Sequence, residues 1–162
     1  WRTLRQAIMQ TFEASSLDEL ASHVGKALAV SDWLTISQER INQFAEVTGD
    51  LQWIHLDAER ARRESPYRTT IAHGYLTLSL LPALSQSCIA VHGTAMAVNY
   101  GLNRVRFMAP VRVNARIRAH FSLQAFEKLP EGGAQVIWQA QVEVEGSDKP
   151  ACVAEMVSRR YV

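Results

Sequence analysis

A carboxylate and an imidazole stand five residues apart in the stretch TGDLQWIH, residues 48–55. Asp50 and His55 can each accept and donate a proton, and together they can hold one water molecule between them. Two large apolar residues, Trp53 and Ile54, separate the pair, although a solvated turn has no use for them. They would help to keep the pair in a dry cleft, where electrostatic interactions are stronger. The pattern therefore indicates acid–base chemistry on a bound water.

Each of these residues also has a purely structural explanation when it is taken alone. Asp50 follows Gly49 and could be a turn or helix-cap residue, and His55 could be a half-buried structural histidine. We expect His73, in the later stretch IAHGYLTL, to make a structural hydrogen bond at the start of a helix. The five histidines show no metal-ligand spacing along the chain, so we expect no metal.

Composition describes an ordinary globular domain. The 162 residues are 48% hydrophobic and 20% charged, with a formal net charge of +1, which gives no basis for binding nucleic acid. No apolar run reaches the roughly 18 residues of a membrane span, and the first residues lack the pattern of a signal peptide. Cys88 and Cys152 stand far apart among apolar residues, as is typical of buried reduced thiols. We therefore expect a cytoplasmic protein.

Helical periodicity and capping residues predict a series of short elements in the first half of the chain. In order, they are a weak amphipathic helix over 1–12, a helix from a Ser16–Glu19 capping box to Gly25, a strand at 33–36, a helix from Ser37 to about Val47, and a helix opened by Asp57. The helix after Ser37 is expected to turn Ile41, Phe44, Ala45 and Val47 inward.

The second half of the chain changes from helical to alternating character. Residues 73–93 are the longest apolar stretch and predict a helix that is buried on all sides, in which Pro82 makes a kink or removes one hydrogen bond. After Gly93, alternating segments separated by turns predict an antiparallel meander of three or four strands. A sheet wrapped around a buried helix is an α+β arrangement and matches the hot-dog architecture. We assign residues 1–30 to an N-terminal helical extension and 31–162 to the hot-dog domain.

Two stretches carry a resemblance to a known family. FAEVTGDLQWIHLD, followed about twenty residues later by IAHGYLTLSLLPAL, resembles the MaoC-like dehydratases, which include the (R)-specific enoyl-CoA hydratases. The resemblance runs from about Trp33 to Val162. Gln52 and Trp53 replace the family's usual Asn-Pro, as in the nodulation protein N-like branch, so the loop beside the acid is expected to differ in shape.

This resemblance implies roles for individual residues. Asp50 and His55 match the family's catalytic pair, and Gly74 matches the residue whose backbone N–H stabilises the thioester oxyanion. The implied or possible substrate contacts are Gln52, Trp53, Ser79, Asn99, Tyr100 and Asn103. The last three could equally be ordinary sheet residues.

The expected function is hydration of a trans-2-enoyl thioester to a (3R)-3-hydroxyacyl thioester, or the reverse, in fatty acid metabolism. The acyl carrier is coenzyme A or acyl carrier protein, so coenzyme A is part of the substrate and no separate cofactor is expected. A hot-dog thioesterase and a non-catalytic acyl-thioester binding subunit remain alternatives. An open sheet edge and the resemblance both predict a homodimer, with the site near the subunit interface.

Overall fold

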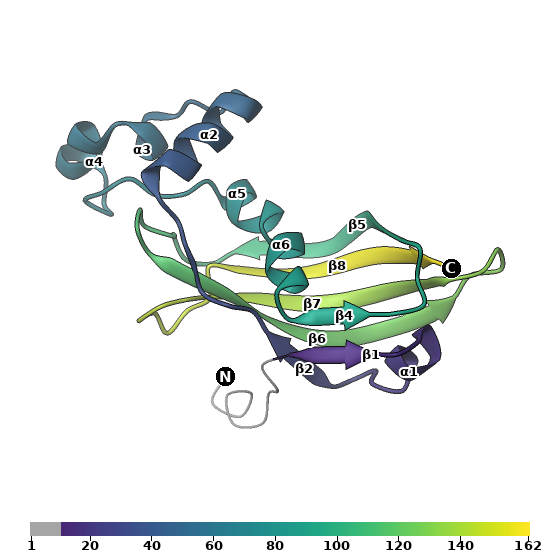
Figure 1. Cartoon of the computed structure of the whole chain (residues 1–162). Helices are drawn as coiled ribbons and strands as arrows, with labels where there is room; N and C mark the ends of the chain where they lie inside the picture. Colours follow the sequence, from purple (N-terminus) through teal and green to yellow (C-terminus); the bar gives the residue numbers. More distant parts are fainter. Residues whose placement is uncertain (1–10) are drawn as a thin grey trace.

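The computed structural model describes residues 11–162 and shows a mostly antiparallel sheet with helices over one face and beyond one end (Figure 1). This is the predicted α+β, hot-dog arrangement. In chain order the elements are β1 (Phe12–Ala14), α1 (Leu17–Ala21), β2 (Ala27–Val30), β3 (Leu34–Thr35), α2 (Gln38–Thr48), α3 (Trp53–Leu56), α4 (Ala58–Glu64), α5 (Gly74–Ser79), α6 (Leu81–Gln86), β4 (Ile89–Val91), β5 (Met96–Phe107), β6 (Arg116–Lys128), β7 (Ala134–Val144) and β8 (Cys152–Tyr161). Among these described elements, no helix is long and apolar enough to cross a membrane.

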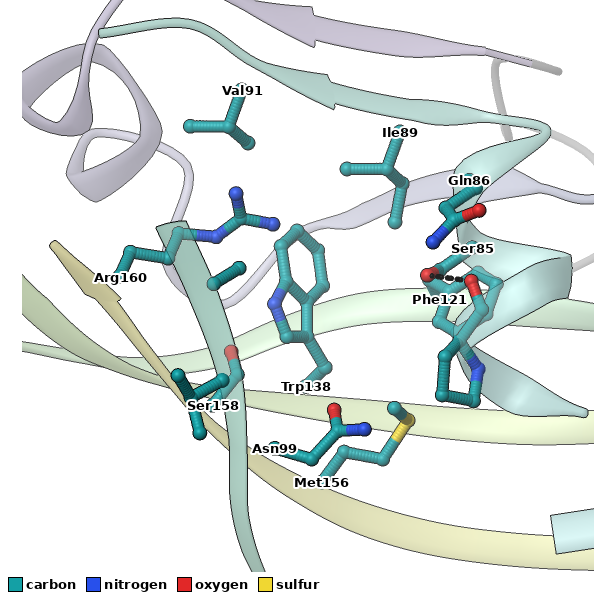
Figure 2. A pocket seen from close by; sticks show the side chains of 13 residues that line it. Ser85, Gln86, Ile89, Val91, Asn99, Phe121, Trp138, Met156, Ser158 and Arg160 are labelled. Carbon is teal, nitrogen blue, oxygen red and sulfur yellow. Dashed lines mark hydrogen bonds between the residues drawn. The ribbon is translucent and has the colours of Figure 1, made fainter. Parts of the chain in front are cut away.

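The main sheet has the order β2-β6-β7-β8-β5, and β3 also pairs with β6. Strands β6 to β8 form the predicted meander, and β5 lies at the edge with β8 as its only neighbour in that order. Buried and partly exposed residues alternate along β7, so one face of the sheet forms the core. Trp138 points from this face toward Ile89 and Val91 on β4 (Figure 2).

The predicted helix over 73–93 is shorter than expected and is divided in two. α5 and α6 meet at Leu80, and Pro82 lies in the first turn of α6, where its missing N–H removes no intrahelical bond. The helical part ends with α6, and the following strand β4, which contains the β-branched residues Ile89 and Val91, pairs in parallel with β1. The prediction that this segment is buried on all sides is also wrong for the single chain, because Tyr75 is 69% exposed.

The segment before residue 31 is not helical throughout. Most of the helix predicted over 1–12 lies outside the described residues, and its last residue begins β1. Ser16 caps α1 as predicted, with its Oγ accepting the Glu19 N–H at 3.1 Å, but α1 ends well before Gly25. β2 pairs with β6 in the main sheet. The domain boundary at residue 30 therefore stays a prediction.

The predicted caps of α2 and α4 are confirmed. Ser37 and Asp57 each accept a backbone N–H from the first turn of the following helix. Ile41 and Ala45 are fully buried, as the helical spacing predicts, whereas Val47 is 81% exposed and does not face the core. These caps fix where α2 begins and α3 gives way to α4, and so they place the loop that carries the candidate acid.

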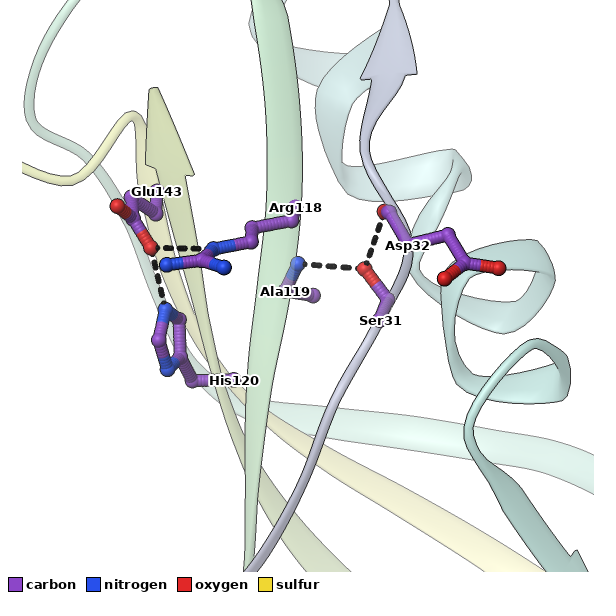
Figure 3. Close-up of polar contacts among 6 residues, drawn as sticks. All are labelled: Ser31, Asp32, Arg118, Ala119, His120 and Glu143. Carbon is purple, nitrogen blue, oxygen red and sulfur yellow. Dashed lines mark hydrogen bonds and ion pairs between the residues drawn. The ribbon is translucent and has the colours of Figure 1, made fainter. Parts of the chain in front are cut away.

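A compact polar cluster lies on the sheet face opposite the core (Figure 3). The Glu143 carboxylate accepts hydrogen bonds from Arg118 Nε at 2.7 Å and His120 Nε2 at 2.6 Å. Burial alone would raise the pKa of Glu143, but these two donors outweigh it and hold the pKa below its ordinary value. Nearby, Ser31 Oγ accepts the Ala119 N–H at 2.9 Å and continues the pairing of β2 with β6.

Candidate active site

Asp50 is placed by the end of α2. Gly49 closes this helix in the left-handed region, at φ 76°, and its N–H donates to the Ala45 carbonyl at 2.8 Å. Glycine adopts this conformation at little cost, which explains the Gly-Asp pair. The side chain of Asp50 is exposed, and its Oδ1 receives only a long contact of 3.5 Å from the Gln52 N–H. The carboxylate is therefore available to other groups.

His55 lies in the one-turn helix α3 and is buried, with 6% exposure. Its Nδ1 lies 2.7 Å from the Ile71 carbonyl. Because a carbonyl can only accept, Nδ1 carries the proton and Nε2 is left as an acceptor. Burial lowers the pKa of His55, with help from the neighbouring His73, and this outweighs the opposing effects of Ile71 and Asp50. The imidazole is accordingly neutral at neutral pH and can accept a proton.

His73 brings the two halves of the site together. Its ring stacks on that of His55, with centroids 3.7 Å apart, and its Nε2 donates to the backbone carbonyl of Asp50 at 3.0 Å. This is the structural hydrogen bond that the sequence predicts, but the stacking on His55 was not foreseen. Its Nδ1 is buried and has no hydrogen-bond partner among residues 11–162. His73 thus ties the start of α5 to both candidate catalytic residues.

Ligand atoms of Asp50, His55 and His73 all lie within 4.8 Å of one another. A carboxylate and two imidazoles are also a donor set that metal ions accept. The spacing along the sequence does not show this set, because the three residues meet only in the fold. The expectation that the reaction needs no metal stays a prediction.

Gln38, which the sequence analysis missed, supports the backbone of His55. Its Nε2 donates to the His55 carbonyl at 2.7 Å, and its Oε1 accepts from Thr70 Oγ1 at 2.6 Å. Thr70 is buried and directly precedes Ile71, the residue that fixes the His55 ring. One amide therefore links both segments that orient the imidazole. Its position just after a helix cap gives no local signal of this role.

Gly74 is the first residue of α5, where backbone N–H groups have no partner within the helix. A Cβ at this position would lie 2.9 to 3.1 Å from ring atoms of Phe107. Such contacts are too close, so any larger residue here would have to displace the Phe107 ring. The Phe107 ring thus packs against the bare backbone of Gly74.

Comparison with known proteins places the chain in a family. Residues 19–143 match the family described as MaoC like domain. The chain belongs to this family. It is 53% identical over 151 residues to 3-hydroxyacyl-thioester dehydratase Z of Mycobacterium tuberculosis strain H37Rv, covering 93% of this chain and 98% of the relative.

Two further comparisons agree with this membership. Nodulation protein N of Rhizobium leguminosarum bv. viciae is 40% identical over 144 residues, covering 88% of this chain and 89% of that protein. The solved structure of the R-hydratase PhaJ1 from Pseudomonas aeruginosa, in its unliganded form, has a TM-score of 0.71 and 25% identity, and the match covers 91% of this chain and 86% of that one.

The residues expected to contact substrate fall into separate groups in this MaoC-like chain. Ser79, Asn99 and Tyr100 line one pocket of about 330 Å³ between α5, α6 and β5. Gln52 is exposed and Trp53 half-buried beside the Asp50–His55 pair. The guanidinium of Arg60 lies 4.3 Å from the Trp53 ring centroid.

Asn103 is not brought into either group. It is exposed on β5, within the bulge between Leu102 and Val105, and does not line the 330 Å³ pocket. A second pocket, of about 230 Å³, includes Gly74 and Phe107 in its lining. The lining of neither pocket contains Asp50 or His55.

The dry cleft predicted around Asp50 is not formed by this chain alone. Asp50 is exposed, and the adjacent Leu51 has 65% of its surface exposed. The edge strand β5 is exposed along almost its whole length, and its apolar residues with large exposed area are Met96, Val98, Tyr100, Leu102 and Phe107. An exposed apolar edge of this kind is a surface that proteins normally cover.

Proposed function

We propose that the protein is a hydro-lyase that adds water to a trans-2-enoyl thioester and gives a (3R)-3-hydroxyacyl thioester, or catalyses the reverse dehydration. The observation that carries this proposal is the pairing of a neutral His55, whose Nε2 is free to accept a proton, with the available carboxylate of Asp50. The names of the dehydratase and hydratase relatives support the same reaction class.

In the proposed reaction, Asp50 and His55 hold one water molecule and remove a proton from it as its oxygen bonds to the β-carbon. The electrons of the double bond move toward the α-carbon and the thioester oxygen. A proton then passes from the pair to the α-carbon, so that one water has been added in total. Pairs of this kind contribute roughly a hundredfold to ten-thousandfold in rate.

Gly74 would stabilise the negative charge that develops on the thioester oxygen, through its backbone N–H at the start of α5. Ser79, Asn99 and Tyr100 would contact the acyl chain, since they share one pocket beside α5. Gln52 and Trp53 would shape the entrance to the catalytic pair. A role for Asn103 rests on the resemblance alone.

We further propose that the active form is a homodimer in the cytoplasm, using coenzyme A or acyl carrier protein thioesters and no separate cofactor or metal. The exposed apolar edge at β5 and the exposed Asp50 both favour a partner subunit that covers the site. Light scattering at micromolar concentration is expected to report a dimer. A stable monomer with full activity would contradict the proposed assembly.

Crotonyl-CoA tests the proposed reaction and its alternatives in one assay. Hydration removes the enoyl absorbance without releasing free thiol, and this is the expected result. Release of free thiol would instead indicate a thioesterase, and binding without either change would indicate a non-catalytic acyl-binding subunit. Dialysis against a chelator is expected to leave the hydration rate unchanged, because the proposed reaction uses no metal.

A further inference from the structure

An arginine faces the core side of the sheet near the end of β8. In the register of β7 and β8, Arg160 pairs with Ala134, Ser158 with Val136, and Met156 with Trp138. The three β7 residues are buried on the face that α6 covers. Since side chains alternate along strands, Met156, Ser158 and Arg160 share this face. A guanidinium therefore occupies a position where the neighbouring strand carries alanine.

One nitrogen of this half-buried guanidinium lacks the hydrogen-bond partner that a buried polar group normally has. Arg160 Nε is buried and has no hydrogen-bond partner among residues 11–162, and the same holds for Ser158 Oγ. By contrast, Arg116 and Arg118 on the outer face are each paired with a glutamate. An arginine does not lose its proton in proteins, so burial without a counter-charge is costly. These two unpartnered donors lie two residues apart on one face. They indicate a place for a hydrogen-bond acceptor that carries negative charge.

Both groups line a pocket of about 320 Å³ between the sheet, α6 and β4. Figure 2 shows the Arg160 guanidinium turned into this space between Val91 and Trp138. Most of the remaining wall is apolar, including Ile89, Phe121 and Met156. The pocket thus has an apolar length and a cationic end, which fits an apolar chain that ends in an anion.

This pocket adjoins the 330 Å³ pocket beside α5. The two pockets share Pro82, Asn99 and Met156 in their linings. The 330 Å³ pocket extends to Leu78, one helical turn beyond Gly74. At about 1.5 Å per helical residue, the distance from Gly74 to the end of α6 is at most about 18 Å. An extended acyl chain of roughly 10 to 14 carbons has a comparable length.

We propose that the substrate is an enoyl thioester whose acyl chain ends in a carboxylate, and that Arg160 binds this carboxylate with a hydrogen bond from Ser158. The inference rests on the proposed hydration, because it takes the thioester end of the same substrate to lie at Gly74. The planar guanidinium can donate two parallel hydrogen bonds to a carboxylate, which makes arginine selective for this group. Arg160 acts as a specificity residue and takes no part in moving protons.

Two trans-2-enoyl-CoA substrates of equal length, one ending in a carboxylate and one in a methyl group, test this inference. The wild-type protein is expected to favour the carboxylate-ended substrate in kcat/KM. Arg160→Met should lower kcat/KM for that substrate about tenfold to a hundredfold, because a charged hydrogen bond is lost. It should leave activity on the methyl-ended substrate equal or higher, since methionine fills the space with apolar surface.

Matched variants separate charge, shape and folding effects. Arg116→Met removes an exposed, paired arginine on the outer face and should change neither substrate's kcat/KM. Arg160→Lys keeps the charge but loses the forked geometry, so it should retain part of the preference. If Arg160→Met fails to fold, Arg160→Lys and the wild-type preference still decide. A wild-type protein that treats both substrates alike, or prefers the methyl end, overturns the proposal.

Failure of this inference can be told apart from failure of the proposed function. If crotonyl-CoA is hydrated but the two long substrates react equally, only the carboxylate inference is wrong. If crotonyl-CoA is not hydrated, calorimetry with the saturated thioester pair tests the pocket by binding alone. Tighter binding of the carboxylate end, lost in Arg160→Met, supports the inference, and equal affinity overturns it. Free adipate that strengthens binding of the methyl-ended thioester would also overturn it, because the anion would then be a separate ligand.

Discussion

The buried histidine pair at α3 and α5 and the charged cluster on the outer sheet face differ in how completely their members are partnered. On the outer face, His120 donates a hydrogen bond to the carboxylate of Glu143, which also accepts one from Arg118. In the site, His55 donates to a neutral carbonyl instead. A carboxylate partner places a negative charge beside the imidazole, whereas a carbonyl fixes the tautomer without adding a charge. The first arrangement stabilises a sheet, and the second keeps a proton acceptor available.

The largest effect is expected where the free acceptor is removed. Asp50→Asn and His55→Gln should each lower kcat roughly a hundredfold to ten-thousandfold while the protein still folds. The double variant should be little worse than either single variant, because the two groups act as a unit. Hydration kinetics and thermal melting measure both properties. Turnover close to the wild-type value in either single variant would show that the pair is wrongly assigned.

Gln38→Leu sharpens the comparison by disturbing the support of His55 and leaving its ring in place. The change leaves the His55 carbonyl and the Thr70 hydroxyl without their partner, which should cost about 1 to 3 kcal/mol of stability. Small displacements of catalytic groups can reduce rate up to about a hundredfold, so kcat should fall by about tenfold or more while KM changes little.

Gln43→Leu is the matched control for this variant. Gln43 lies on the exposed side of the same helix, and its amide makes only a 3.4 Å contact with Glu39. The control should keep wild-type kcat and nearly wild-type stability. A Gln38→Leu protein with unchanged kcat and pH profile would show that Gln38 supports the fold alone.

His55 should make the stability of the protein depend on pH near the ordinary pKa of histidine. Because burial lowers the pKa of His55, the unfolded state binds more protons than the folded state just below the ordinary value of about 6.5. Stability is therefore lost as pH falls through that value, and His55→Gln should reduce this loss. Urea unfolding between about pH 7 and pH 5 measures it. An unchanged slope in the variant would mean that His55 is not buried in its neutral form.

The smallest effect is expected on the outer face. Glu143→Gln keeps the size of the side chain but removes its charge from beside Arg118 and His120, and should cost about 1 kcal/mol. Hydration of crotonyl-CoA should be unaffected, because the cluster lies on the sheet face opposite the core. A large loss of turnover in a folded Glu143→Gln protein would remove the distinction drawn between the two regions.

Local signals explain what the sequence could predict. Ser37 and Asp57 mark helix starts because capping is a contact between near neighbours. The meander was predictable because alternation along β6 to β8 follows from burial of one sheet face. The fold class followed from this alternation together with the apolar helical segment, whereas the two motifs that contain Asp50 and Gly74 were assigned through the resemblance to a known family.

The remaining features depend on contacts between distant residues. Ile89 to Val91 read as the end of a helix because an apolar run does not distinguish helix from strand, and only pairing with β1 settles it. Gln38 acquires its role from residues 55 and 70, which no local pattern reveals. In the sequence, Arg160 is one of three consecutive polar residues near the end of a strand. Only the pairing with Ala134 on β7 shows that it faces the core side of the sheet.

The boundary at Leu80 divides one apolar segment into two parts that can change independently in evolution. Residues proposed to act on the thioester lie in the loop after α2, on α3 and on α5, whereas most of the far pocket is formed by α6, β4 and β8. Substitutions in the second group can change which chain end is accepted while the atoms that move protons keep their surroundings. Related proteins could therefore differ in the acyl chains that they accept and still catalyse the same reaction.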